Sequence, residues 1–446
     1  MKKIEPSGKI GGMITVPGDK SIAHRAVLLS VLAQEKVTIK NFPKNEDCLR
    51  SLEAVKILGV DVKDETNLLE LYPPEKIEIN SDAIIDCGNS GTTVRLLSGI
   101  IAGSNVEVTL AGDESLSQRP MKRIIDPLTE MGAEFYCDEF KLPMKIKGKK
   151  LLPLEYRMPV ASAQVKSAIL LAGLSYGCTV VVREDKITRD HTELMIKELG
   201  EGINIRDIKP VPIQDPIDPR KKRMEMPEDF KKEITITPQA KYIGGIVDIP
   251  GDISTAAYFF AAAAISKGEV TVQGVGLNPT RTAFLEYLRK IGCKVAINNK
   301  VTISGELRGD VTVVGADLKS RKISGETTVG LIDEIPIIAV IASFAKGTTV
   351  IRNAEELKVK ESDRLQAISD NLKILGVKHG LLDDGIAIEG GKDYSGSDFK
   401  SFGDHRIAMA FSIASLFLIG SSTIDDEACV NISCPNFYDL LNKIRK

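Results

Sequence analysis

The chain contains nearly the same five-residue phrase twice, and each copy leads into an apolar, helix-like segment. The first copy is Pro-Gly-Asp-Lys-Ser at residues 17–21, and the second is Pro-Gly-Asp-Ile-Ser at residues 250–254. The first copy carries Lys20 and, about one helical turn later, Arg25, whereas the second continues into alanine and phenylalanine without charge. One scaffold has therefore been used twice, and its first copy has gained the charged residues that point to chemistry.

A glycine-terminated helix pattern also recurs along the chain. Each amphipathic segment ends in an apolar residue followed by glycine, and the last copy, residues 439–446, stops where its glycine would come. Glycine at this position predicts a helix C-cap, because it takes the left-handed conformation at little cost. The glycines concerned are Gly59, Gly132, Gly200, Gly292 and Gly376.

A second pattern alternates with the first and consists of a small, apolar helical segment followed by a β-branched strand. Each unit is then a helix, a strand, a second helix and one or more strands. Six such units predict an α/β protein (α+β in the looser sense) of repeated architecture. The apolar helices are expected to begin near Ser21, Thr92, Gln164, Ser254, Ile335 and Arg406.

Composition narrows the class of protein. A length of 446 residues favours two or three domains. A net charge of −2 disfavours nonspecific nucleic-acid binding, and seven cysteines without close pairing favour reduced thiols in the cytoplasm. The longest apolar segment, 407–419, is shorter than the roughly 20 residues that a membrane helix needs, and no apolar signal segment follows Met1. We expect a cytoplasmic monomer without nucleic-acid or membrane partners.

One segment interrupts the repeats and suggests where the domains divide. Residues 210–233 contain five prolines and the basic cluster 220–223, which favours a solvated loop or insertion near a domain junction. We therefore expect one domain at residues 19–245 and a second made of residues 1–18 and 246–446. The N-terminal strand at 10–16 is expected to pair with the C-terminal half.

Polar and charged residues gather where the six apolar helices begin. For Asp252, Ser254 and Asp404 we favour helix capping, which these residue types perform well. Capping does not explain cations such as Lys20 and Arg406, because the positive end of the helix dipole disfavours them. Cations beside free backbone N–H groups suit a bound anion, so converging helix starts would form an anion-attracting cleft.

Two further segments, 117–123 and 358–364, are rich in charged residues, and the sequence leaves more than one interpretation of them open. Residues 117–123 form a polar stretch before a helix, and residues 358–364 alternate acid and base. The second could be a salt-bridged, solvated helix face, or a carboxylate flanked by cations that transfers a proton beside a bound anion. The chain has no phosphate-binding loop, dinucleotide fingerprint or metal-ligand spacing of histidines, which favours an enzyme without metal or cofactor acting on small anions.

At these residues the chain resembles the family of 5-enolpyruvylshikimate-3-phosphate (EPSP) synthases. The resemblance covers nearly the whole chain, through the segments PGDKSIAHR, GNSGTTVRLLSG, QRPMKR, SAQVKSA, TRDHTE, VKESDRL and GDHRIAMAF in the family's order. It implies an enolpyruvyl transferase-like fold of six βαβαββ units, three in each of two domains that close on the substrates. The implied reaction, a step of aromatic amino acid biosynthesis, joins shikimate 3-phosphate to phosphoenolpyruvate by addition and elimination and releases phosphate.

The resemblance also implies roles for individual residues. Asp333 corresponds to the proton acceptor for the 5-hydroxyl, Glu361 to the proton donor for the methylene carbon, and Lys20 to a second acid–base group. The residues expected to bind shikimate 3-phosphate are Lys20, Ser21, Arg25, Ser162, Ala163, Gln164, Arg189, Asp333 and Lys360. Those expected to bind phosphoenolpyruvate are Lys20, Gly91, Arg119, Gln164, Arg364 and Arg406.

The sequence departs from the family at two of these places and matches it at a third. Residues 431–435 contain no lysine, although many relatives have one there that holds phosphoenolpyruvate, and Ala163 replaces a serine of some relatives. Gly91 keeps the small residue at which an added methyl group is associated with glyphosate tolerance, so we expect glyphosate to inhibit this enzyme.

Two alternatives remain at this point. The enolpyruvyl transferases that act on UDP-N-acetylglucosamine are expected to share the fold, but they carry Lys-x-x-Asn near the start, where this chain has Lys20-Ser-Ile-Ala23. A non-catalytic anion-binding repeat protein would need the cations but neither Asp333 nor Glu361.

Overall fold

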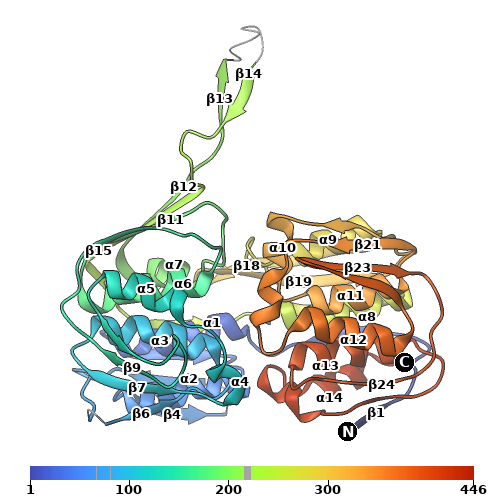
Figure 1. Cartoon of the computed structure of the whole chain (residues 1–446), viewed down its shortest axis with the longest axis horizontal. Coiled ribbons are helices and arrows are strands. Elements are labelled where there is room, and N and C mark those ends of the chain that lie inside the picture. The colour runs from blue at the N-terminus through green and yellow to red at the C-terminus, as the bar shows by residue number, and fades with distance from the viewer. Residues whose placement is uncertain (67, 81, 215–221) are drawn as a thin grey trace.

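The computed structural model describes residues 1–446 except residues 67, 81 and 215–221, and it folds into two lobes that lie side by side (Figure 1). The first lobe has its hydrophobic core between Ile22 and Ile249. The second lobe collects its core from Ile253 onward and also buries Ile4, Ile10, Ile14 and Val16 from the N-terminal segment. The N-terminal segment thus packs with the C-terminal half, as its similarity to the segment before Pro250 predicts.

The six apolar helices form where the repeats predict them. Side-chain oxygens cap five of the six starts, since Asp19, Ser90, Ser162, Asp252 and Asp404 each accept a hydrogen bond from a backbone N–H of the first turn. The inner helices are α1 (Lys20–Leu29), α3 (Gly91–Gly103), α6 (Ala163–Tyr176), α8 (Ile253–Ser266), α11 (Ile335–Phe344) and α13 (His405–Ser415).

The amphipathic helices alternate with them along the chain, with their glycines after the last turn. Four of these glycines have positive φ, from 77° at Gly376 to 116° at Gly292, as expected for caps. Gly200 is different: its φ of −154° is extended, strand β12 begins at once, and a Cβ there would lie 2.3 Å from the Lys241 carbonyl oxygen. The prediction of a left-handed cap is therefore wrong at Gly200, where close chain approach requires glycine. These helices are α2 (Glu46–Ile57), α5 (Lys122–Glu130), α7 (His191–Leu199), α9 (Ala283–Ile291), α12 (Arg364–Leu375) and α14 (Phe437–Ile444).

Each lobe has three small sheets, which confirms the predicted fold of six units. The first-lobe sheets have the orders β16 (Gly245–Asp248), β3 (Val37–Lys40), β5 (Leu68–Tyr72), β4 (Asp61–Glu65); β6 (Ile84–Asp86), β7 (Glu107–Ala111), β9 (Met144–Lys147), β8 (Glu134–Tyr136); and β10 (Leu154–Arg157), β11 (Val180–Glu184), β15 (Lys232–Tyr242), β12 (Gly200–Asp207). In each of these three sheets, the first two strands of the order run parallel to each other. The remaining neighbouring strands run antiparallel.

The second lobe repeats this plan with one shorter sheet. Its sheets have the orders β18 (Lys294–Ile303), β19 (Glu306–Val314), β17 (Glu269–Gly276), β2 (Gly11–Thr15); β20 (Lys322–Ile323), β21 (Gly347–Ile351), β23 (Gly385–Gly390), β22 (Lys378–Leu382); and β1 (Lys2–Ile4), β25 (Ser422–Ile424), β24 (Asp398–Phe399). Strand β2 runs parallel to β17, so the N-terminal strand pairs with the C-terminal half.

The duplicated phrase lies where the chain crosses between the lobes. The backbone N–H of Asp19 donates to the Pro250 carbonyl at 2.8 Å, and that of Asp252 donates to the Pro17 carbonyl at 2.9 Å. Strand β16 comes just before the second crossing and pairs with β3 of the first lobe, where Val247 is buried in the core. The boundary expected after residue 245 therefore precedes a strand that belongs to the first lobe.

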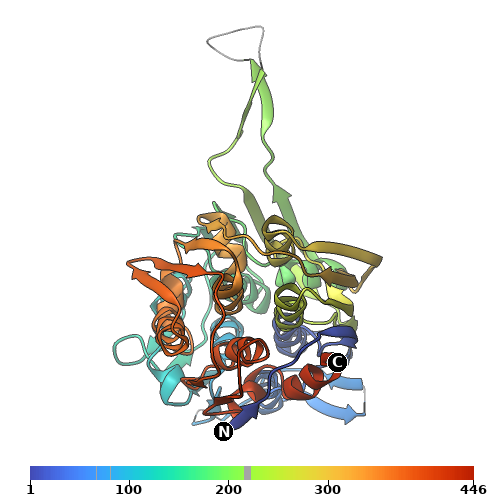
Figure 2. The ribbon, with the colours of Figure 1, turned by 90° about the vertical axis from the view of Figure 1, so that its right-hand side faces the viewer.

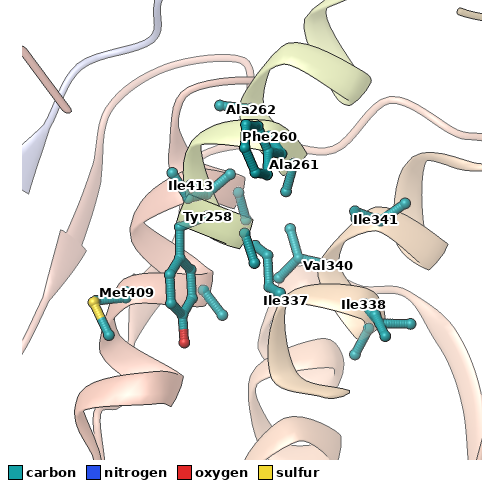
Figure 3. Close-up of a cluster of buried hydrophobic side chains, with 14 of the residues drawn as sticks. Tyr258, Phe260, Ala261, Ala262, Ile337, Ile338, Val340, Ile341, Met409 and Ile413 are labelled. Atoms are coloured by element: carbon teal, nitrogen blue, oxygen red, sulfur yellow. The ribbon is translucent and has the colours of Figure 1, made fainter. Parts of the chain in front are cut away.

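The core of the second lobe is formed mainly by its three inner helices. Tyr258 and Phe260 of α8, Ile337 and Val340 of α11, and Met409 of α13 pack together in this cluster (Figure 3). These helices are apolar on nearly all sides because neighbouring helices and sheets cover them. Within the described part of the chain, no helix is both long and apolar enough to cross a membrane.

The proline-rich segment forms an arm rather than a plain loop. Strands β13 (Val211–Gln214) and β14 (Lys222–Glu225) pair antiparallel and extend away from the first lobe (Figures 1 and 2). Residues 220 and 221 of the predicted basic cluster lie outside the described residues. The short elements α4 (Glu114–Ser117), α10 (Glu326–Leu331), η1 (Ser30–Leu32), η2 (Glu355–Val359) and η3 (Ala428–Ile432) complete the fold.

Candidate active site

A cavity lies between the lobes, at the point where inner helices of both lobes begin. The expected convergence of helix starts is therefore found in the structure. The lining includes Lys20, Ser21, Gly91, Arg119, Ser162, Ala163, Gln164, Arg189, Asp333, Lys360, Glu361, Arg364 and Arg406. All of these come from the set predicted by the resemblance, and only Arg25 of that set is not part of the lining.

Asp333 lies between cations from both lobes. Arg189 of the first lobe forms an ion pair with its Oδ2, and Arg406 of the second lobe approaches the same oxygen at 3.5 Å. Arg364 lies 3.8 Å from Oδ1. Burial alone would raise the pKa of this carboxyl, but Arg406 and its neighbours outweigh that effect and hold the pKa well below its ordinary value. Asp333 is therefore ionised and can accept a proton.

Glu361 is held by the most deeply buried arginine of the site. Arg364 NH2 donates to Glu361 Oε2 at 2.5 Å, and Arg364 Nε donates to Asp404 Oδ2 at 2.7 Å. Asp404 also caps α13, as expected, by accepting a hydrogen bond from the Arg406 backbone N–H. The same carboxylate therefore binds both the start of α13 and the Arg364 guanidinium. Burial favours protonation of Glu361, but the Arg364 cation outweighs it and holds the pKa of Glu361 well below its ordinary value.

Lys20 begins α1 and points at the first-lobe side of the cavity. Its Nζ lies 2.8 Å from Asp47 Oδ2, and its backbone N–H donates to Asp252 Oδ2 at 3.1 Å. Burial disfavours the charged ammonium, but Asp47 opposes this most strongly and the pKa of Lys20 is raised. Lys20 is therefore protonated, as binding of an anion requires.

Arg95 lines the cavity and was missed by sequence reasoning. Its NH1 donates to Gln164 Oε1 at 2.9 Å and to the Gly91 carbonyl at 3.4 Å, while Gln164 Nε2 donates to Thr92 Oγ1. The sequence signal was present, because Arg95 follows Gly91 by four residues, as Arg25 follows Ser21. In both repeats the arginine bonds back to the carbonyl four residues earlier.

Arg25 itself lies beneath the cavity floor. Its guanidinium donates to Thr192 Oγ1 at 2.7 Å, to Ser167 Oγ at 2.9 Å and to the Ser21 carbonyl at 2.9 Å. Burial lowers the pKa of Arg25 to about 10. In this arrangement Arg25 fixes the start of α1, on which Lys20 and Ser21 sit.

Arg281 is a second lining residue that the motifs did not reveal, and it joins the two copies of the duplicated phrase. Its NH1 lies 3.0 Å from Asp19 Oδ2 and its NH2 lies 3.7 Å from Asp252 Oδ1. Ser254 accepts from Arg281 NH2 at 2.8 Å and bonds Glu334, so it does not cap α8 as expected. The cap falls to Asp252 alone because Arg281 and Glu334 occupy the serine hydroxyl.

Two other expectations concern residues around the site. The segment 431–435, which lacks the family's lysine, lies at the lobe interface, where the Asn45 side chain donates to the Ser433 carbonyl at 3.2 Å. Among the residues that the structure describes, no group of three histidine, cysteine, aspartate or glutamate side chains is arranged to hold a metal ion.

Comparison with known proteins places this arrangement in one family. The family model of EPSP synthase (3-phosphoshikimate 1-carboxyvinyltransferase) matches residues 4–219 and 221–441. Among curated proteins, the 3-phosphoshikimate 1-carboxyvinyltransferase of Desulforamulus reducens is 42% identical over 446 residues, covering 99% of this chain and 98% of the relative. That of Oceanobacillus iheyensis is also 42% identical, with the same coverage. Among solved structures, EPSP synthase from Acinetobacter baumannii is 34% identical with a TM-score of 0.81, covering 99% of this chain and 98% of that one.

Proposed function

This chain belongs to the EPSP synthase family and is a 3-phosphoshikimate 1-carboxyvinyltransferase of the shikimate pathway, and we propose that its two substrates meet in the cleft between the lobes. The observation that carries the proposal is the composition of this cleft. Cations from both lobes surround two ionised carboxylates there, and both shikimate 3-phosphate and phosphoenolpyruvate are anions. Helix starts with free backbone N–H groups add to the attraction.

The assignment of residues to the two substrates follows the motifs and the geometry of the cleft. Shikimate 3-phosphate is bound by Lys20, Ser21, Arg25, Ser162, Ala163, Gln164, Arg189, Asp333 and Lys360. Phosphoenolpyruvate is bound by Lys20, Gly91, Arg119, Gln164, Arg364 and Arg406. Arg25 is not part of the cavity lining and already donates to Thr192 and Ser167, whereas the other cations of the two sets line the cavity.

The addition step uses the two carboxylates in opposite roles. The 5-hydroxyl oxygen of shikimate 3-phosphate attacks C2 of phosphoenolpyruvate and gives its proton to Asp333, while Glu361 protonates C3. The low pKa of Asp333 keeps this acceptor ionised, and anionic substrates that offset the charge of the surrounding arginines make it a stronger base. Elimination then breaks the C2–O bond to phosphate and returns a C3 proton to Glu361, which leaves the vinyl ether. The departing phosphate takes the hydroxyl proton from Asp333, so both carboxyl groups return to their starting states.

Glu361 has to gain a proton before it can donate one. In the empty cleft Arg364 keeps it ionised. A phosphoenolpyruvate anion bound at Arg364 and Arg119 offsets the charge of these cations, so the pKa of Glu361 rises when the substrate binds. The buried position of Glu361 then favours its protonated form.

Replacing Glu361 tests this assignment. We expect Glu361→Ala to lower kcat for phosphate release by at least about 100-fold, the usual contribution of general acid–base catalysis. Shikimate 3-phosphate should still bind, as measured by calorimetry, because Glu361 is not among its ligands. Asp363→Ser is the control, since this neighbouring carboxylate only caps α12 and serine also caps. Full activity of Glu361→Ala would remove Glu361 from the mechanism.

The acceptor is tested separately with the wild-type enzyme. Phosphate release that needs both shikimate 3-phosphate and phosphoenolpyruvate supports the proposal. Release only with UDP-N-acetylglucosamine and phosphoenolpyruvate would mean that UDP-N-acetylglucosamine is the acceptor. Binding without any turnover would point to an anion-binding protein.

We also propose a cytoplasmic monomer whose two domains follow the two lobes. Free thiols at all seven cysteines support a reducing compartment. Light scattering on the eluting peak of a sizing column tests the monomer, and a dimer mass would refute it.

A further inference from the structure

The segment Thr188-Arg189-Asp190-His191 joins β11 to α7 and contributes Arg189 to the cavity. Arg189 NH1 donates to Ser21 Oγ at 3.2 Å, and its NH2 pairs with Asp333 across the cleft. Each of the three other side chains of the segment has a polar partner. The contacts that hold Thr188, Asp190 and His191 therefore determine the position of the Arg189 guanidinium.

On the first-lobe side, Thr188 is anchored to a buried charge cluster. Its Oγ1 donates to Glu184 Oε1 at 2.5 Å, and its backbone N–H donates to the same oxygen at 3.3 Å. Lys166 Nζ forms ion pairs with Glu184 Oε2 at 2.9 Å and with Glu193 Oε1 at 2.7 Å, and all three side chains are 0% exposed. The residue before Arg189 is therefore fixed to its own lobe.

On the other side, Asp190 and His191 are bound by the second lobe. His191 Nδ1 lies 2.6 Å from Glu306 Oε1, and Asn278 Nδ2 donates to Asp190 Oδ1 at 2.9 Å and to Glu306 Oε2 at 3.3 Å. His191, Asn278 and Glu306 are buried, and Asp190 also pairs with Lys232 at 3.0 Å. We call Asp190, His191, Asn278 and Glu306 the interlobe joint.

The joint lies beside the crossing between the lobes. Asn278 and Arg281 belong to the same loop after β17, and Arg281 pairs with Asp19 just after the crossing. Arg189 sits between Thr188, which is held by the first lobe, and Asp190, which is held by Lys232 of the first lobe and Asn278 of the second.

We propose that Glu306, with Asn278 and His191, is a positioning group that holds Arg189 where it meets the phosphate of shikimate 3-phosphate. The proposal rests on the proposed function, because it takes Arg189 as a ligand of that substrate. Glu306 touches neither substrate and acts only through the segment 188–191. Removing it takes away the partner of the buried His191 Nδ1 and one of the two acceptors of Asn278 Nδ2, so the segment shifts to satisfy them.

The test compares Glu306→Ala with Arg189→Ala and with the double variant. Calorimetric titration with shikimate 3-phosphate should give a Kd about tenfold weaker for Glu306→Ala, because small misplacements of a clamping side chain are costly. The KM for phosphoenolpyruvate should stay within about twofold of wild type. In the Arg189→Ala background, Glu306→Ala should change the Kd by less than about twofold. Asp248→Asn is the matched control, since it weakens another interlobe ion pair, with Arg308 at 2.8 Å, away from Arg189.

Three results would overturn the proposal: an unchanged Kd in Glu306→Ala, the same loss in the Arg189→Ala background, or an equal loss with Asp248→Asn. If Glu306→Ala does not fold, Glu306→Gln keeps the shape, places an amide N–H₂ against Asn278, and is judged by the same measurements. Binding of shikimate 3-phosphate is measured without turnover. Failure of wild type to release phosphate would therefore count against the proposed function, whereas these results bear on the joint.

Discussion

Gly91→Ala is the change for which the structure gives the sharpest expectation. Gly91 is the first residue of α3, and its neighbours Arg95 and Arg119 face the cavity. A Cβ at position 91 would lie 2.7 Å from Arg95 NH1 and 3.4 Å from Arg119 NH1. The first distance is too short for contact, so the Arg95 guanidinium has to move by some tenths of an ångström.

The cost follows from what Arg95 holds. Its NH1 donates to Gln164 Oε1 at 2.9 Å, and Gln164 is among the residues proposed to bind both substrates. A hydrogen bond from a charged donor contributes about 1.5–3 kcal/mol, and each 1.4 kcal/mol is roughly a factor of ten. We therefore expect the KM for phosphoenolpyruvate to rise about 10- to 100-fold. Any loss of stability should be small, because alanine favours a helix over glycine by about 1 kcal/mol and so offsets part of the weakened bond.

Steady-state kinetics and thermal melting together check this reasoning. Gly99→Ala is the control on the same helix, since its Cβ would lie 2.1 Å from the Ala168 carbonyl oxygen and would force α3 and α6 apart. That variant should lower the melting temperature far more than Gly91→Ala does, because its clash is with backbone rather than with a side chain. An unchanged KM in Gly91→Ala would refute the role given to Arg95 and Gln164.

Lys166→Met leaves Glu184 and Glu193 buried without their cation, and we expect urea titration to show a loss of about 3–5 kcal/mol at neutral pH. Burial already raises the pKa of Glu184, and a carboxyl with a raised folded pKa loses stability as pH rises through that pKa. The loss should therefore be smaller at about pH 5 than at about pH 8, and an equal loss at both would contradict the assignment. Glyphosate should inhibit in the micromolar range in competition with phosphoenolpyruvate, and a lack of inhibition at millimolar concentration would exclude this. Because Arg25 is tied to side chains beneath the cavity, Arg25→Ala should weaken shikimate 3-phosphate binding less than Arg189→Ala, and the reverse order in calorimetry would mean that Arg25 turns into the cleft on binding.

The sequence by itself determined the repeated architecture and about half of the cavity lining. Helix caps, glycine ends and β-branched strands are local signals, so the six units could be read from residue order alone. Cations at helix starts are also a local anomaly, and they identified Lys20 and Arg406 before any fold was known. Arg95 had the same signal as Arg25 in its spacing and could have been found in this way.

Only the tertiary structure decided which residues meet. Capping accounts for the two aspartates of the duplicated phrase locally, but only the chain crossing placed Arg281 between Asp19 and Asp252. The role of Glu306 beside His191 likewise depends on two residues from different lobes. Gly200 looked like a cap, but a strand lies too close for any other residue. Such contacts join residues far apart in the chain, and no local pattern encodes them, because their free energy comes from packing and burial in the folded protein.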